Sequence, residues 1–378
     1  MTANRIDPLE PAAMGPLALR NRFVRSATWE GMAATDGSVT PALVETMREL
    51  ARGEVGLIVS GHAYVRRDGQ AGPRQLGAYD DASIPGLADM ATAVHDAGGK
   101  IALQLAHAGC HAAVQLSGLE AVAPSPWTGK SGGHARELDL GEIAELPAAF
   151  ADAARRAKTA GFDAVQIHMA HGYFLSQFLS PRYNRRADEY GGSLENRSRL
   201  PMAVYRAVRK ATGTDFPVLA KINSRDFVEG EEFVPEEMIA VSRMLAEAGI
   251  DAIEMSGGTV ESSPRLGPVR AGRISGEADE VYYRETAERF REAGVGVPLI
   301  LVGGIRSLSV ARDLTATGTA DFIAMARPLI REPHLIRRWH AGDERRATCE
   351  SDNLCFRPAM EGRGILCLTE ARESGTEE

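Results

Sequence analysis

Short apolar runs recur along the chain and alternate with longer amphipathic stretches. Most of the runs, such as VGLIVSG and PLILVGG, are apolar almost without interruption, which is typical of parallel strands covered on both faces. Eight runs are predicted as strands: Phe23–Thr28, Gly56–Ala63, Lys100–Ala106, Asp163–Met169, Pro217–Asn223, Asp251–Met255, Pro298–Val302 and Asp321–Ala326. Amphipathic helices are predicted between them: Pro41–Glu54, Ser83–Ala97, Pro147–Ala160, Glu195–Thr212, Pro235–Ala248, Tyr282–Ala293 and Ser307–Thr317.

This alternation predicts an α/β fold, a closed TIM (β/α)8 barrel, for residues 1–340. An open doubly wound sheet is the competing fold. It usually carries a glycine-rich dinucleotide loop after its first strand, whereas here that strand runs into SATWEGMAATDG. Residues 107–146 and 171–194, after the third and fourth strands, are predicted as extended loops at the barrel mouth, and long loops are usually functional. Residues 341–378 are predicted as a C-terminal extension.

Composition narrows the range of partners. The 378 residues include 43 Lys and Arg against 51 Asp and Glu, a net charge of −8. This charge disfavours nucleic acid and membrane surfaces, because phosphate groups are bound by basic faces. The amino terminus lacks the apolar core of a secretory signal, and no stretch approaches the roughly 20 apolar residues of a membrane span. The few cysteines favour a reducing cytoplasm.

Glycines and an arginine at the ends of the last two strands predict a phosphate site. VGGIRS contributes Gly303 and Gly304, and MARPL contributes Ala326 and Arg327. Together they offer backbone N–H groups and a guanidinium where barrels often bind phosphate. Gly257, after the sixth strand, can add to the same cradle. A glycine pair alone would indicate a tight turn, but the arginine at the next strand end favours phosphate.

Three polar side chains at other strand ends suit the ring of a flavin. The Gln104 amide offers a donor and an acceptor to a pyrimidine edge, and Lys221 can neutralise charge near N1 and O2 of a reduced ring. The Thr28 hydroxyl can hydrogen-bond near N5 and O4. Each residue alone has an ordinary structural explanation. Lys221 also leaves open a class I aldolase, in which it would form a Schiff base with a sugar phosphate.

His168, His171 and Tyr173 form a second cluster at the end of the fourth strand. Two imidazoles can hydrogen-bond one carbonyl oxygen and stabilise enolate-like charge, and a tyrosine can protonate the carbon α to that carbonyl. The alternatives are a structural histidine pair or a zinc site completed by histidines of residues 107–146. No tight metal-ligand spacing is present, so we expect no metal.

At this point the chain resembles the Old Yellow Enzyme family of FMN-dependent NAD(P)H oxidoreductases. The segment IHMAHGYFLSQFLSPRYNRRADEYGGSLENRSRL, residues 167–200, is similar to the family signature over almost its full length. SATWEGMA, QLAHAG, LAKIN, VGGI and MARPL support the resemblance, which covers roughly residues 5–340. It implies FMN in the barrel, NADPH or NADH as hydride donor, and ping-pong reduction of an activated alkene. The family often forms dimers or larger assemblies.

The resemblance also implies roles for the candidate residues. The three polar side chains would contact the isoalloxazine ring, the glycine pair and Arg327 would hold the phosphate, the histidine pair would bind the substrate carbonyl, and Tyr173 would donate the proton. His62 stands where many relatives have a small residue, so a backbone contact to the flavin is expected and the role of its side chain stays open. The alternative function is an FMN-dependent dehydrogenase or demethylase of a cyclic amine or natural-product intermediate, because the same residues serve either direction.

Residues 349–367, CESDNLCFRPAMEGRGILC, resemble the iron–sulfur segment of the 2,4-dienoyl-CoA reductase branch. An expected cysteine is replaced by Asp352 or Asn353. Three cysteines remain: Cys349, Cys355 and Cys367. Because a [4Fe–4S] cluster usually takes four cysteine ligands, we predict no cluster and a tail that packs on the barrel or a neighbouring subunit. That branch continues into further flavin- and nucleotide-binding domains where the present sequence stops. Direct reduction of FMN by a nicotinamide is therefore expected here.

Overall fold

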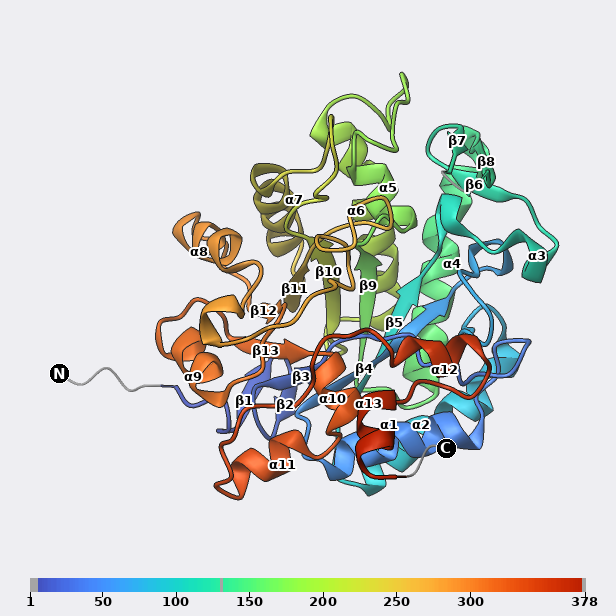
Figure 1. The fold of residues 1–378 in the computed structure, drawn as a ribbon. Coiled ribbons are helices and arrows are strands. Elements are labelled where there is room, and N and C mark those ends of the chain that lie inside the picture. The colour runs from blue at the N-terminus through green and yellow to red at the C-terminus, as the bar shows by residue number, and fades with distance from the viewer. Residues whose placement is uncertain (1–5, 130–131, 376–378) are drawn as a thin grey trace.

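Eight parallel strands close into a barrel in the computed structural model, which describes residues 6–129 and 132–375 (Figure 1). Neighbouring strands follow the order β10-β11-β12-β13-β3-β4-β5-β9, and β9 pairs with β10 to close the ring. The barrel strands are β3 (Phe23–Arg25), β4 (Leu57–Tyr64), β5 (Ile101–Ala106), β9 (Ala164–Met169), β10 (Val218–Asn223), β11 (Ala252–Ser256), β12 (Leu299–Val302) and β13 (Phe322–Met325). The predicted TIM barrel is therefore confirmed.

Helices follow the strands and form the outer layer of the barrel. They are α1 (Pro41–Arg52), α2 (Ile84–Asp96), α4 (Leu140–Thr159), α6 (Leu194–Thr212), α7 (Pro235–Glu247), α8 (Arg284–Glu292), α9 (Leu308–Ala316), α10 (Arg327–Arg331) and α11 (Leu335–His340). Helix α4 begins earlier than predicted, because Asp139 and Glu142 form a capping box ahead of it. Pro147 was taken as a first-turn residue, but it lies inside the helix.

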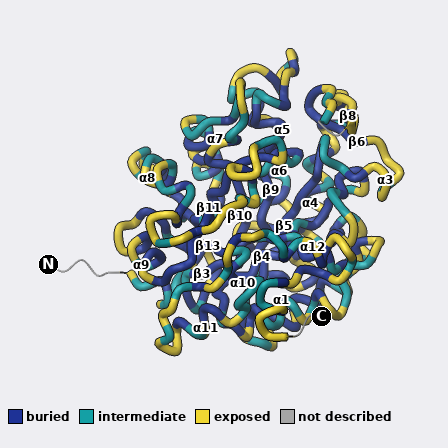
Figure 2. Tube along the Cα trace, in the orientation of Figure 1, coloured by how far each residue is buried: buried dark blue, intermediate teal, exposed yellow. Residues whose placement is uncertain are grey.

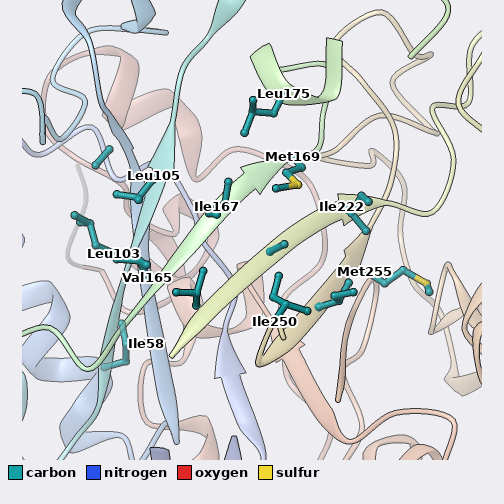
Figure 3. Close-up of a cluster of buried hydrophobic side chains, with 14 of the residues drawn as sticks. Ile58, Leu103, Leu105, Val165, Ile167, Met169, Leu175, Ile222, Ile250 and Met255 are labelled. Atoms are coloured by element: carbon teal, nitrogen blue, oxygen red, sulfur yellow. The ribbon is translucent and has the colours of Figure 1, made fainter. Parts of the chain in front are cut away.

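Side chains of the strands alternate between the helical layer and the barrel interior, as the period of a strand requires. Figure 3 shows apolar side chains such as Leu103, Val165 and Ile167 on neighbouring strands, and these belong to the large buried cluster that includes the helices. Intervening residues such as Ala102 and Ala164 form a smaller cluster inside the barrel. Buried segments accordingly run through the centre of the molecule in Figure 2.

A short hairpin that was not predicted closes the amino-terminal end of the barrel. It consists of β1 (Ala12–Met14) and β2 (Leu17–Leu19), which pair antiparallel. Its buried side chains Met14, Leu17 and Leu19 join the apolar cluster inside the barrel. The floor of the barrel is therefore apolar, and the polar residues of the interior lie above it.

The segments predicted as loops contain further structure. Residues 107–146 include the 3₁₀ helix η3 (Gly109–His111), α3 (Val114–Ser117) and a small sheet of β6 (Ala121–Ala123), β7 (Trp127–Thr128) and β8 (His134–Glu137). Residues 171–194 include α5 (Phe174–Leu179). Other 3₁₀ helices are η1 (Arg67–Gly69), η2 (Asp81–Ser83) and η4 (Glu277–Asp279). Within residues 6–129 and 132–375, no helix has the length and apolarity needed to cross a bilayer.

The carboxyl-terminal tail packs on the barrel. It contains α12 (Phe356–Met360) and α13 (Leu368–Glu373), seen in red in Figure 1. Cys355, Ala359 and Ile365 form a small apolar cluster with side chains that include Trp29 and Met32. The tail thereby reaches the carboxyl ends of the barrel strands, the same side as the candidate site.

Candidate active site

A cavity of about 470 Å³ opens at the carboxyl ends of the barrel strands. Its volume lies in the range of small-molecule and cofactor sites, which is roughly 300–1,000 Å³. The sequence-predicted residues that line it are Thr28, His62, Gln104, His168, His171, Tyr173, Lys221, Gly303, Gly304, Ala326 and Arg327. Side chains from distant parts of the chain therefore converge on one cavity.

Gly257 is a predicted cofactor residue that does not line the cavity. The Tyr283 hydroxyl donates to the Gly257 carbonyl at 3.2 Å. A Cβ atom at Gly257 would lie 2.7 Å from the Tyr283 ring. The tyrosine thus covers this glycine and takes its place on the cavity wall.

At the base of the cavity, five buried side chains form a continuous hydrogen-bonded layer. The Gln104 amide donates to Gln166 at 2.7 Å, and Gln166 donates to the Glu254 carboxylate at 2.7 Å. The other oxygen of Glu254 accepts from the Lys221 ammonium at 2.9 Å and from the Ser26 hydroxyl at 2.5 Å. Lys221 also donates to Ser26 at 2.8 Å. The layer holds Gln104 and Lys221 in place, because each has a buried partner.

The alternation of strand side chains explains how this layer arises. Inward positions of β9 are Ala164 in the apolar floor, Gln166 in the polar layer and His168 at the mouth. Strand β5 repeats the pattern with Ala102 and Gln104, and Gln104 lies beside Gln166 in the strand register. Gln166 and Glu254 are buried and lie before the strand ends, so they were not among the predicted site residues. The available signal was a polar residue two positions before the cavity-lining residue of the same strand.

Thr28 lies three residues after the end of β3, and His62 lies within β4. The Thr28 hydroxyl donates to the Ser26 carbonyl at 3.0 Å. Strand β4 contains an irregularity between Val59 and His62, which shifts its pairing with β5 and changes which residues face inward. The Nε2 atom of His62 is buried and has no hydrogen-bond partner among the described residues. It is therefore a polar atom that a ligand can satisfy.

The histidine pair and Tyr173 form one wall of the cavity. The His168 ring centroid lies 5.1 Å from that of His171 and 5.1 Å from that of Tyr173. His171 has a φ of +68°, and its backbone N–H donates to the Asn223 side chain at 3.0 Å. Its Nε2 atom lies 2.8 Å from the Ser256 hydroxyl oxygen. The Nδ1 atom of His168 is buried without a partner in the part of the chain that the structure describes.

Burial sets the protonation states of this wall. It lowers the pKa of His168 and of His171 well below the ordinary histidine value, and the Lys221 ammonium adds to the effect. Burial and Lys221 also lower the pKa of His62 to about 4. Burial raises the pKa of Tyr173 to about 12. At neutral pH the imidazoles are therefore neutral and the phenol is protonated.

The opposite end of the cavity is basic. Gly303 and Gly304 have φ values of +130° and +78°. A Cβ atom at Gly304 would lie 2.6 Å from the Tyr282 ring, so only glycine fits this turn. Arg327 is the first residue of α10, just after β13, and Arg306, which was not predicted as a site residue, also lines this end. Two guanidiniums beside a glycine turn are the donor set that a phosphate requires.

The residues present fit FMN. The basic end suits its phosphate, and the amide and ammonium of Gln104 and Lys221 suit the polar edge of its pyrimidine ring. The unpartnered nitrogens of His62 and His168 leave buried polar atoms for ligands. No group of three or more potential metal ligands is gathered among the described residues. The absence of a metal or cluster remains a prediction.

A family model described as the NADH:flavin oxidoreductase / NADH oxidase family matches residues 9–345. The chain belongs to this family, which is that of Old Yellow Enzyme. The cofactors expected from the sequence, FMN with NADPH or NADH, are confirmed as those of the family.

Individual relatives agree with this assignment. The chain is 39% identical over 323 residues to an NADH oxidase of Thermoanaerobacter brockii, covering 85% of this chain and 48% of the relative. A solved 2-naphthoyl-CoA reductase complex is similar with a TM-score of 0.89 and 28% identity, over 98% of this chain and 57% of the other. An Old Yellow Enzyme homologue from Zymomonas mobilis has a TM-score of 0.78 and 27% identity, over 96% and 98% of the two chains.

This member of the NADH:flavin oxidoreductase family is shorter than some of its relatives. It spans about half the length of the first two curated relatives, 48% and 54%. The match to the second relative spans 97% of this chain, so it includes the carboxyl-terminal tail as well as the barrel. The barrel carries the family assignment, and the activity of the whole protein is a separate question.

Proposed function

We propose that this chain is an ene-reductase that oxidises NADPH or NADH and reduces the C=C bond of α,β-unsaturated carbonyl compounds. One observation carries the proposal. The ring centroids of His171 and Tyr173 each lie 5.1 Å from the ring centroid of His168. The three rings line the same cavity as Lys221 and Gln104. A carbonyl-binding pair and a proton donor thus share the cavity with the residues that fit a flavin ring.

The histidine pair is suited to bind the substrate carbonyl oxygen. Because the pKa values of His168 and His171 are lowered, each ring is neutral and has one N–H to donate. Ser256 lies at Nε2 of His171, which fixes the orientation of that ring. Two N–H donors on one carbonyl oxygen withdraw electron density from the conjugated double bond and stabilise enolate-like charge.

Tyr173 is suited to protonate the α carbon. Its raised pKa keeps the phenol protonated, so it can act as a general acid once enolate-like charge develops. When bound, FMN supplies the hydride chemistry between NAD(P)H and the β carbon. The balance is one hydride from the nicotinamide and one proton from Tyr173, which solvent then returns to the phenolate. Gln104, Lys221, Arg306 and Arg327 are the residues that would hold the cofactor.

The direction of the reaction is tested with the purified, FMN-containing chain under anaerobic conditions. We expect NADPH or NADH to bleach the flavin absorbance and 2-cyclohexen-1-one to restore it. Cyclohexanone is the matched control, because it carries the carbonyl without the double bond and should leave the flavin reduced. The proposal is wrong if a cyclic amine bleaches the flavin while the enone fails to restore it, and the dehydrogenase alternative then holds.

A further inference from the structure

The carboxyl-terminal tail passes directly over the basic end of the cavity. The Ala347 N–H donates to the Arg306 carbonyl at 2.9 Å, which joins the tail to the loop between β12 and α9. Ser351 and Asn353 then adopt left-handed conformations, with φ values of +62° and +63°. This conformation is uncommon for non-glycine residues and points to a fixed local structure. Phe356, three residues after Asn353, lines the cavity itself.

Asn353 holds the guanidinium of Arg327. The Asn353 Oδ1 atom accepts from Nη1 of Arg327 at 2.6 Å. The same Nη1 atom donates to the Arg270 carbonyl at 2.9 Å and to the Ser351 carbonyl at 3.5 Å. Every hydrogen bond that the Arg327 guanidinium donates to a described residue therefore comes from Nη1. The tail fixes one end of the guanidinium and leaves Nη2 and Nε for a ligand.

Ser351 holds the second arginine. The Arg306 Nη2 atom donates to the Ser351 hydroxyl at 2.9 Å and lies 3.8 Å from the Cys349 sulfur. Arg306 is only 3% exposed, and no carboxylate of a described residue lies within salt-bridge distance of its guanidinium. A buried cation with neutral partners is costly until an anion compensates it. A phosphate bound between Arg306 and Arg327 would supply that compensation.

We propose that Ser351 and Asn353 are positioning residues that hold Arg306 and Arg327 for the phosphate of FMN. The tail then makes the site selective for phosphorylated flavin over riboflavin. The segment that resembles an iron–sulfur motif would serve as one wall of the cofactor site. This inference rests on FMN as the cofactor of the proposed function, and it does not depend on the substrate.

The test compares the affinities of the flavin-free full chain for FMN and for riboflavin, measured by quenching of flavin fluorescence. For a Ser351→Ala/Asn353→Ala double variant we expect FMN to bind about tenfold more weakly, the size of a lost hydrogen bond to a charged group. Riboflavin affinity should change by less than about twofold, because riboflavin has no phosphate. Asp352→Ala is the matched control: its side chain is exposed and contacts Leu354 and Thr369, so both affinities should stay unchanged.

A second variant, Asn353→Asp, keeps the shape of the side chain and adds a carboxylate beside Arg327. We expect this carboxylate to compete with the phosphate, so that FMN affinity falls and riboflavin affinity does not. Equal losses for both flavins, or no loss for either, would overturn the proposal, because the tail would then act through packing alone or have no role. Wild-type protein that binds neither flavin would instead contradict the cofactor assignment.

Discussion

The middle of the barrel and its mouth both contain buried polar side chains, but they differ in how completely these are hydrogen-bonded. In the middle, Gln104, Gln166 and Glu254 are linked to one another and to Lys221. At the mouth, the buried Nε2 atom of His62 and Nδ1 atom of His168 have no partner among the described residues. Because an unpaired buried polar group costs roughly 1–3 kcal/mol, the mouth is suited to a ligand, and the middle keeps its geometry without one.

The largest effect is expected at the mouth. Replacing Tyr173 with phenylalanine removes the proton donor and keeps the ring, so enone turnover should fall by about 10²- to 10⁴-fold. Reduction of the flavin by NADPH should keep its rate, because that half-reaction needs no proton from Tyr173. Stopped-flow measurement of each half-reaction separates the two. Equal slowing of both half-reactions would show that the tyrosine shapes the site and does not supply the proton.

The next effect concerns stability in the middle layer. Glu254→Ala leaves the buried Lys221 ammonium without its carboxylate partner, which should cost about 3–5 kcal/mol of unfolding free energy. Urea denaturation of the flavin-free protein measures this loss. The control is Glu288→Ala, which removes an exposed ion pair with Arg284 and should cost less than about 1 kcal/mol. Similar small losses in both variants would mean that the middle layer does not stabilise the barrel.

A smaller effect is expected at His171, the histidine of the mouth whose side chain already has a hydrogen-bond partner. Ser256→Ala removes the hydroxyl that lies 2.8 Å from His171. The loss of one neutral hydrogen bond, about 1 kcal/mol, should raise the KM for an enone about fivefold and change kcat little. Ser242→Ala, a buried serine in α7, is the matched control and should leave KM unchanged. A fall in kcat with unchanged KM would contradict a role in carbonyl binding.

The last effect is a pH dependence of stability. The pKa of His62 is lowered to about 4 in the folded chain, whereas an unfolded histidine has a pKa near 6.5. The unfolded chain therefore binds more protons between these values, and stability should fall as pH drops from 6.5 towards 4. Thermal unfolding of the wild type and of His62→Phe over this range measures the effect. The variant should show the shallower decline, and an equal decline would argue against a neutral buried His62.

The barrel and its mouth could be predicted because both follow local patterns. The strand ending at Met169 was predicted within one residue, since Gly161 ends the preceding helix and a largely apolar run follows it. The middle layer needed the strand register, which the sequence does not show: Lys221 lies beside Glu254 only because β10 and β11 are neighbours. The contact between Asn353 and Arg327 joins elements that no local pattern links, so only the structure could reveal it.

A crystal structure of the chain with FMN tests the difference between the middle and the mouth most directly. We expect Lys221 Nζ to lie within hydrogen-bond distance, about 3 Å, of the pyrimidine edge, with the phosphate at Arg306 and Arg327 and the bonds between Gln166 and Glu254 unchanged. A flavin bound away from these residues, or a middle layer rearranged to reach it, would contradict the account.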